Sequence, residues 1–183
     1  METTDEILII DLEATCWQED GEKQRQQSEI IEIGVCKMDA DSGEIIKSEG
    51  ILVKPVHSAI SVFCTRLTSI TPQMVEQNGV SLSEACAMLE QKYGAKQLTW
   101  ASYGAYDKNM LREQCAKFNV KYPLSAQHYN VKVLFADAYR LPKGIGMERA
   151  LKMLNLPLVG THHRGVDDAK NIAKIMYRLL IEA

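Results

Sequence analysis

The chain has 183 residues, 46% of them hydrophobic, which is enough to bury one compact core, so we expect a single domain over residues 1–183. Lys and Arg number 21 and Asp and Glu 24, and the net charge of −3 argues against indiscriminate binding of polyanions. The N-terminus does not resemble a signal peptide and no apolar run is long enough to span a membrane, so the sequence predicts a cytoplasmic protein without a membrane partner. The five scattered cysteines predict reduced thiols rather than a disulfide framework or a zinc site.

The N-terminal half is predicted to consist mainly of strands. Apolar runs bounded by turn-forming residues predict strands at 6–13, 30–39 and 45–54, the last two joined in an antiparallel meander by the turn at 39–43. Thr71 and Pro72 open a short helix, and Ser81 caps another that runs to about Tyr93.

The C-terminal half follows a buried strand at 98–102 and is mainly helical. The apolar periodicity predicts helices at 104–118, 131–140, 146–154 and 166–181. Strands followed by helices favour an α/β fold in which helices cover a mixed sheet.

Asp11 and Glu13 end the first strand on one face, because side chains alternate along a strand. Two ionised carboxylates at the end of a buried strand repel one another unless a cation compensates them, so the pair suggests a divalent metal. Solvated strand ends also carry such pairs, and this stretch alone leaves both interpretations open.

The helix at 104–118 carries Asp107 near the middle of its apolar stripe. The stripe consists of Tyr106, Met110, Leu111, Cys115 and Phe118. A carboxylate in such a stripe needs an interior partner. A role in starting the helix, favoured by the macrodipole and the free amides of the first turn, explains the same position equally well.

The last helix carries two adjacent aspartates with different expected surroundings. Asp168 lies at the edge of the apolar face, whereas Asp167 shares a side with Asn171 and Lys174 and is expected to be a solvated first-turn residue. Asp168 can therefore meet Asp11, Glu13 and Asp107. Four carboxylates can hold two hard ions, Mg²⁺ or Mn²⁺ rather than zinc, and ions about 3.5–4 Å apart clamp both oxygens of a phosphoryl transfer.

Two further features bear on this chemistry. His162 and His163 lie on the loop before Asp168, where an imidazole can take a proton from water, although loop histidines are often only exposed to solvent. Residues 1–106 carry 8 Lys/Arg and 17 Asp/Glu, and residues 107–183 carry 13 and 7, giving net charges of −9 and +6. A basic surface beside an acidic pocket suits an anionic substrate, but solvated helix faces explain the charge equally well.

Three segments resemble, in order and spacing, the motifs of the DEDDh family of 3′-5′ exonucleases. They are Asp11-Leu-Glu13, Tyr103-Gly-Ala-Tyr-Asp107 and His163-Arg-Gly-Val-Asp-Asp168. Residues 11–17, 63–68 and 160–173 look most like the branch of the histone-mRNA 3′-end exonuclease and the enhanced-RNAi nucleases. The resemblance implies a ribonuclease-H-like mixed five-stranded sheet flanked by helices, with Asp11, Glu13, Asp107 and Asp168 as ligands of two Mg²⁺ or Mn²⁺ ions and His163 as general base.

The resemblance also places a terminal-nucleotide pocket. It implies that Ala14 and Thr15 meet the 3′-terminal sugar, and that Phe63, Leu67 and Tyr106 lie near the base. Plain core packing remains an equal alternative for Phe63 and Leu67, and Trp17 either stacks on a base or covers a loop. Relatives often carry an acidic residue at the position of Ala105 and tryptophan at that of Tyr106, so base preference is not carried over.

The expected function is hydrolysis of single-stranded RNA or DNA 3′ ends, RNA favoured, by a two-metal mechanism that releases 5′-mononucleotides. A narrow pocket for one terminal nucleotide requires an unpaired end. The alternatives are a DNA-directed exonuclease of the proofreading or repair type and a non-catalytic nucleic-acid-binding regulator on the same fold. The sequence names no protein partner, and no segment accounts for the stem-loop-directing domain of the histone-mRNA enzyme.

Overall fold

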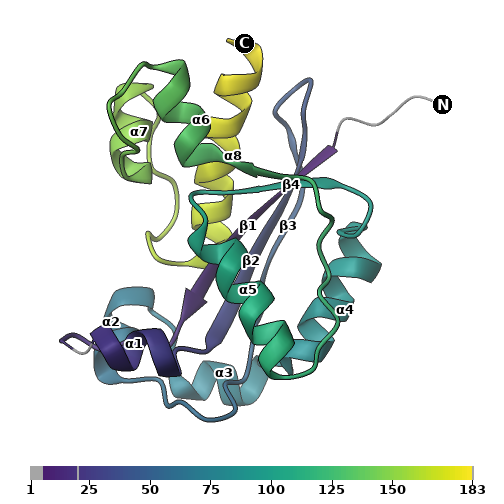
Figure 1. The fold of residues 1–183 in the computed structure, drawn as a ribbon, viewed down its shortest axis with the longest axis vertical. Helices are drawn as coiled ribbons and strands as arrows, with labels where there is room; N and C mark the ends of the chain where they lie inside the picture. Colours follow the sequence, from purple (N-terminus) through teal and green to yellow (C-terminus); the bar gives the residue numbers. More distant parts are fainter. Residues whose placement is uncertain (1–5, 20, 183) are drawn as a thin grey trace.

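A computed structural model describes residues 6–19 and 21–182, and its centre is a twisted five-stranded sheet (Figure 1). Strand order is β3-β2-β1-β4-β5. The antiparallel part comprises β1 (Glu6–Ala14), β2 (Ile30–Asp39) and β3 (Ile45–Leu52), and the parallel part adds β4 (Thr99–Ser102) and β5 (His128–Asn130) beside β1. The predicted mixed sheet and its meander are therefore confirmed.

Helices cover both faces of this sheet and the end at which β1 stops. They are α1 (Gly21–Gln27), α2 (Val62–Thr68), α3 (Pro72–Asn78), α4 (Leu82–Tyr93), α5 (Tyr106–Lys117), α6 (Val131–Ala138), α7 (Met147–Met153) and α8 (Gly165–Ile181). In Figure 1, α6, α7 and α8 lie on one side of the sheet and α4 and α5 on the other. None of the helices in the described residues is long and apolar enough to cross a membrane.

The alternation of side chains along β1 divides the core into two layers. Ile7 and Ile9 pack in the layer that contains the buried residues of α6, α7 and α8, whereas Leu8 and Ile10 pack against α4 and α5. Because the side-chain period of a strand is two residues, Asp11 and Glu13 continue the face of Ile7 and Ile9. The strand thus carries its two carboxylates toward the first turn of α8.

The helix starts and the turn that were predicted from capping and turn-forming residues are confirmed. Thr71 and Ser81 are the N-caps of α3 and α4, and Ser81 forms a full capping box with Glu84. The Asp39 carboxylate accepts a hydrogen bond from the Ser42 amide in the turn between β2 and β3. All five cysteines are free and buried, as expected of packing residues.

Three elements were not expected from the sequence. Helix α1 buries none of its residues, so it shows no apolar stripe, and β5 is only three residues long. The third, α2, does carry a start signal, because the Ser61 side chain accepts a hydrogen bond from the Cys64 amide. That serine is the feature from which α2 could have been predicted.

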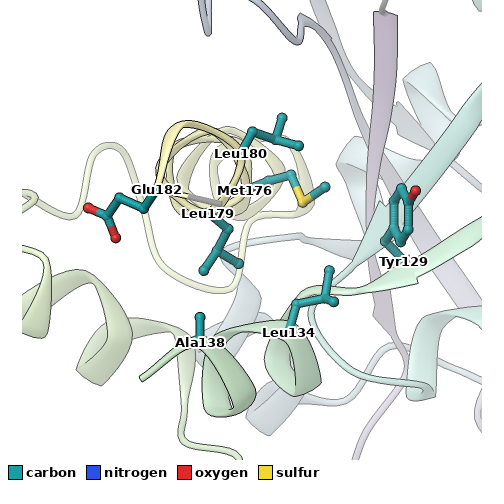
Figure 2. Close-up of a pocket in the computed structure, with 7 residues that line it drawn as sticks. All are labelled: Tyr129, Leu134, Ala138, Met176, Leu179, Leu180 and Glu182. Carbon is teal, nitrogen blue, oxygen red and sulfur yellow. The ribbon is translucent and has the colours of Figure 1, made fainter. Parts of the chain in front are cut away.

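An apolar pocket lies between α6, α8 and the β5 edge (Figure 2). Its lining residues are Tyr129, Leu134, Ala138, Met176, Leu179, Leu180 and Glu182. Eight residues separate Asp168 from Met176, about 12 Å along a helix. The pocket is therefore at the opposite end of α8 from the acidic residues.

Candidate active site

The strands β1 and β2 present a row of acidic residues and a glycine on the face covered by α8. In their antiparallel register Asp11 lies opposite Gly34, and Glu13 lies opposite Glu32. Only 9% of the Glu13 surface is exposed, and Asp11 is half-buried. Among the described residues, neither carboxylate makes a hydrogen bond, so both oxygen pairs are available for a ligand.

Asp107 approaches the same strand from the start of α5. It is 6% exposed, and its Oδ1 accepts a hydrogen bond from the Leu12 amide at 3.0 Å. Asp107 therefore fits both interpretations given above, because it lies in the first turn of its helix and its side chain also faces an interior partner. The predicted stripe was wrong at one position: Tyr106 is 56% exposed, and Gln114 is buried in the interior instead.

Asp168 completes the cluster from the first turn of α8. It is 4% exposed, and one oxygen each of Asp11, Glu13 and Asp168 lie within 4.8 Å of one another. That spacing suits oxygen ligation of a hard divalent cation. Asp168 faces the interior and meets Asp11 and Glu13, as predicted, whereas Asp107, which was expected to meet it too, is not part of this 4.8 Å group.

Burial and mutual repulsion raise the pKa values of this cluster. The pKa of Glu13 rises to about 9, first because of burial and then because of Asp168, and the neighbouring Arg164 guanidinium opposes the rise. Burial raises the pKa of Asp107 to about 6, and burial followed by the charge of Asp107 raises that of Asp11 well above its ordinary value. Without a cation the site therefore disfavours full ionisation.

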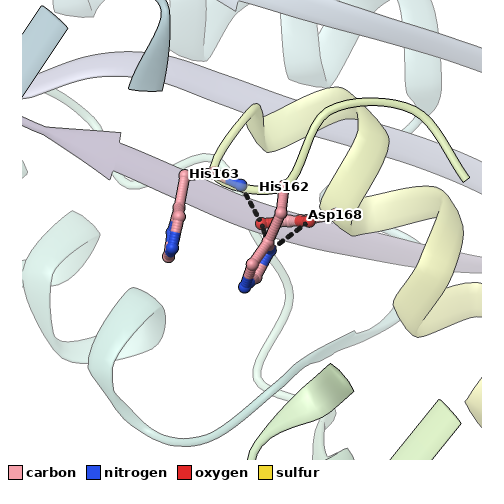
Figure 3. Close-up of side chains that lie close together, drawn as sticks. All are labelled: His162, His163 and Asp168. Carbon is pink, nitrogen blue, oxygen red and sulfur yellow. Dashed lines mark hydrogen bonds and ion pairs between the residues drawn. The ribbon is translucent and has the colours of Figure 1, made fainter. Parts of the chain in front are cut away.

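The two histidines contact Asp168 in different ways, which bears on the question of which is the base. His162 Nδ1 is 3.0 Å from Asp168 Oδ1, while the His163 amide donates to Asp168 Oδ2 at 2.9 Å (Figure 3). The two rings stack at 3.9 Å between centroids. Burial, followed by the neighbouring His162, lowers the pKa of His163, so its ring is neutral and able to accept a proton near neutral pH.

The backbone at His163 is held in an unusual conformation. Its φ is 64°, in the left-handed region that non-glycine residues seldom adopt. The hydrogen bond from its amide to Asp168 helps to hold it there. Strained residues of this kind cluster at functional sites, which links the loop to the carboxylates.

The surroundings of Asp167 differ from those predicted. It is partly buried, and its Oδ2 accepts a hydrogen bond from the Thr161 amide at 2.9 Å, so it anchors the histidine loop. Asn171, which was expected to share a solvated side with it, is fully buried and exchanges two hydrogen bonds with the Val159 backbone. Both side chains thus hold the loop onto α8.

Comparison with known proteins decides the family. The sequence model of the family described as Exonuclease matches residues 8–176. This chain belongs to the exonuclease family. Its fold matches the nuclease domain of 3′hExo, a DEDDh family member bound to rAMP, with a TM-score of 0.86 and 30% identity over 100% of this chain and 94% of that one.

Curated relatives place this exonuclease domain in the branch expected from its motifs. The rat (Rattus norvegicus) 3′-5′ exoribonuclease 1 is 32% identical over 96% of the chain and 53% of the relative, and human ERI1 exoribonuclease 3 is 31% identical over 94% and 53%. A structure of a 3′-exonuclease that recognises the histone mRNA stem-loop has a TM-score of 0.86, 27% identity and coverage of 98% and 83%. The chain spans about half the length of these curated relatives.

The residues expected around a terminal nucleotide differ in exposure. Leu67 and Tyr106 are 38% and 56% exposed, so plain core packing does not account for Leu67. Phe63 and Ala14 are half-buried. Thr15 is fully buried, and its hydroxyl accepts from the Glu29 amide and contacts the Ser58 hydroxyl, so in this structure its side chain belongs to a loop network.

Two buried residues that were not predicted from the sequence hold parts of the candidate site in place. Glu29 accepts hydrogen bonds from the amides of Val56, His57 and Ser58, and it thereby fixes the loop after β3. Glu32 accepts hydrogen bonds from the start of α8. A glutamate facing inward in an otherwise apolar strand was the signal available for Glu32.

One face of the Trp17 ring is covered by a side chain that lies nearby in the sequence. The Lys23 ammonium of α1 lies 4.5 Å from the centre of its ring, and the Gln24 side chain accepts a hydrogen bond from its amide. These contacts favour the second of its two expected roles, covering a loop.

Proposed function

We propose that this chain is a metal-dependent 3′-5′ exonuclease that hydrolyses single-stranded nucleic acid from the 3′ end, with RNA favoured, and releases 5′-mononucleotides. The observation that supports this most strongly is the convergence of Asp11, Glu13 and Asp168, with Asp107 on the adjoining strand amide, beside two loop histidines. Family membership supports the proposed reaction class, and the geometry supports the choice of residues.

The donor set fits two Mg²⁺ or Mn²⁺ ions. All four proposed ligands are carboxylates, which are the oxygen donors that these ions prefer. The raised pKa values of Asp11, Glu13 and Asp107 support this, because they reflect a cluster without sufficient positive charge of its own. When bound, the ions would supply an activated water and stabilise the charge that develops on the phosphodiester.

We assign the general base to His163. Its lowered pKa leaves the ring unprotonated near neutral pH, and the hydrogen bond from its amide to Asp168 holds it beside a proposed metal ligand. His162 contacts the Asp168 carboxylate directly, which suits a residue that orients Asp168. In this proposal His163 removes a proton from water, and the His162 ring and the His163 amide together orient Asp168.

The terminal sugar is proposed to lie at Ala14 and Thr15, and the base at Phe63 and Leu67 with Tyr106 beside them. The exposed aromatic ring of Tyr106 can stack on any base, which suits successive removal of different nucleotides. The network of Thr15, Glu29 and Ser58 fixes the loop that borders this place. A 3′-phosphate would add negative charge beside the carboxylates and should block entry.

RNA is favoured because the relatives are exoribonucleases and because one similar nuclease domain was solved with rAMP. The 2′-hydroxyl is the group by which a protein distinguishes RNA from DNA at a given position. We therefore expect a modest preference for a terminal ribonucleotide over a terminal deoxynucleotide.

The test uses single-stranded RNA and DNA of one sequence, each labelled at its 5′ end and incubated with Mn²⁺. The proposal predicts a ladder shortened by single nucleotides, released 5′-mononucleotides, and no reaction on chains that end in a 3′-phosphate. Chains with one terminal ribonucleotide should be cut faster than matched deoxy chains. Internal fragments as first products would contradict the exonuclease assignment, and faster cutting of the deoxy end would favour a DNA-directed enzyme.

Two broader expectations accompany this function. We propose that residues 1–183 form one exonuclease domain, of which residues 1–5, 20 and 183 lie outside the described part of the chain. We also propose a cytoplasmic location, which the five free cysteines support because thiols stay reduced there.

A further inference from the structure

Glu32 is a carboxylate that the proposed reaction does not use, although it lies beside the acidic cluster. It is fully buried in the middle of the sheet and lies directly opposite Glu13 in the register of β1 and β2. Like charges that face one another across two strands destabilise a sheet, and a buried carboxylate adds a desolvation cost. A residue with these costs needs a compensating contact.

That contact is the start of α8. The Glu32 carboxylate accepts hydrogen bonds from the Gly165 amide at 2.8 Å, from Arg164 Nε at 3.2 Å and from Arg164 Nη2 at 3.3 Å. Three donors from two consecutive residues satisfy the carboxylate, and two of them belong to the single positively charged guanidinium of Arg164. The interaction joins β2 to the same turn of helix that carries Asp168.

The backbone packing around this contact leaves little freedom. A Cβ at Gly34 would lie 1.9 Å from the Gly165 carbonyl carbon, so the two glycine backbones touch. Gly34 is also the residue opposite Asp11 in the sheet. The first turn of α8 is therefore held by one polar anchor, Glu32, and one close backbone contact, Gly34 with Gly165.

We propose that Glu32 is a positioning residue, which fixes the first turn of α8 so that Asp168 reaches the oxygens of Asp11 and Glu13. This inference rests on the proposed metal site. Glu32 itself is not a proposed metal ligand, because its carboxylate already accepts hydrogen bonds from the Gly165 amide and the Arg164 side chain. Residues that orient ligands typically change metal affinity about 10- to 100-fold when they are mutated.

The experiment measures Mn²⁺ binding to the full chain by calorimetry, with the thermal unfolding of each variant as a second readout. Glu32→Gln keeps the shape of the side chain and one hydrogen-bond acceptor but loses the negative charge. Arg164→Gln removes the positive charge of the same ion pair. Glu49→Gln is the control, because Glu49 is a partly buried glutamate of the neighbouring strand β3 that also accepts side-chain hydrogen bonds, but from Lys92 and Tyr93 of α4 rather than from α8.

Positioning predicts that Glu32→Gln and Arg164→Gln both bind Mn²⁺ roughly tenfold more weakly, whereas Glu49→Gln keeps the affinity of the unaltered chain. A simple effect of charge predicts opposite signs, because losing Arg164 would make the site more negative and tighten binding. Tighter binding by Arg164→Gln would therefore overturn the proposal.

Two other results would also overturn it. Unchanged Mn²⁺ affinity in a folded Glu32→Gln would make Glu32 a structural residue only, and a loss as complete as that of Asp11→Asn would make it a ligand. Failure of the unaltered chain to bind Mn²⁺ would overturn the proposed metal site and, with it, the positioning role of Glu32. Failure of the positioning role alone leaves Mn²⁺ binding by the unaltered chain intact, so the two outcomes are distinguishable.

Discussion

Asp167 and Asp168 are neighbours in the first turn of α8 and face different partners. Asp168 meets the oxygens of Asp11 and Glu13, and Asp167 binds the Thr161 amide. Helical phase separates them, since consecutive residues point about 100° apart. Removing one charge at each position should therefore have very different effects.

We expect Asp168→Asn to lower turnover at least about 100-fold, the scale of losing one electrostatic contributor to an active site. Asp167→Asn should lower it less than about tenfold, because asparagine can still accept from Thr161 and a hydrogen bond contributes about 0.5–1.5 kcal/mol net. Single-turnover rates on a labelled oligonucleotide measure both. Equal losses would show that the inward face of α8 is wrongly assigned.

The histidines offer a second comparison between neighbours. His163→Ala should slow the chemical step by about 100-fold or more, as expected for a lost general base, while substrate binding largely survives. His162→Ala should have a smaller effect, which operates through the orientation of Asp168. Pre-steady-state rates at saturating substrate separate the two, and the reverse ranking would move the base to His162.

At the residue scale, the inward positions of Asp11, Glu13, Asp107 and Asp168 were predictable because the periods of strands and helices can be read from a pattern of apolar residues, whereas their role as ligands stays a prediction. The partners of those residues were not predictable. Glu29, Glu32 and Asn171 owe their roles to contacts across 12 to 133 positions of sequence, and a local pattern can at most mark such a residue as buried, as it does for Glu32, without naming its partner. Tyr106 was misplaced for a related reason, because apolar spacing along a helix does not distinguish a core residue from an exposed aromatic one.

At the element scale, the close contact between β2 and α8 decides where Asp168 lies. Gly34→Ala would introduce a methyl group into the space of the Gly165 backbone, so α8 must shift away from Asp11. We expect a loss of about 1–3 kcal/mol in stability, or roughly 3 °C or more in melting temperature, together with weaker activity.

Gly146→Ala is the control for that substitution. A Cβ at Gly146 meets nothing within 4 Å, and its φ of −67° is allowed for alanine. Thermal unfolding of both variants should show a drop only for Gly34→Ala. Similar melting temperatures for the two variants would contradict the close packing of α8 on β2.

Long or well-capped elements were predictable from the sequence, and short or polar ones were not. The strands β1 to β4 and the helices α3 to α8 follow apolar periodicity and capping residues. Helix α1 is polar on all sides, and β5 is held in the sheet by its pairing with β4 rather than by its own pattern. Such elements are determined by tertiary contacts.

At the scale of the whole molecule, the acidic cluster makes stability depend on pH and on metal. A carboxyl group whose pKa is raised on folding contributes stability that is complete below its unfolded pKa and is lost as pH rises through its folded pKa. For Glu13 this window runs from its ordinary value of 4.5 to about 9, and for Asp107 from 3.8 to about 6. The metal-free chain should lose this contribution across that range.

A bound divalent cation replaces the missing protons, so its stabilising effect should grow with pH. We expect the rise in melting temperature on adding Mn²⁺ to be small near about pH 5 and larger near about pH 8. Scanning calorimetry with and without Mn²⁺ measures this difference, and the comparison cancels titration elsewhere in the protein. A rise that shrinks with pH would contradict the assignment of these carboxylates as ligands.

The most direct test of the central claim is hydrolysis of a 5′-labelled single-stranded RNA by the chain after its metal has been stripped. With excess chelator we expect no product, because clustered carboxylates without counter-ions repel the phosphodiester. Adding Mg²⁺ or Mn²⁺ beyond the chelator should restore stepwise loss of nucleotides from the 3′ end, and Asp168→Asn should stay inactive under the same conditions. Robust hydrolysis in excess chelator would contradict the two-metal site.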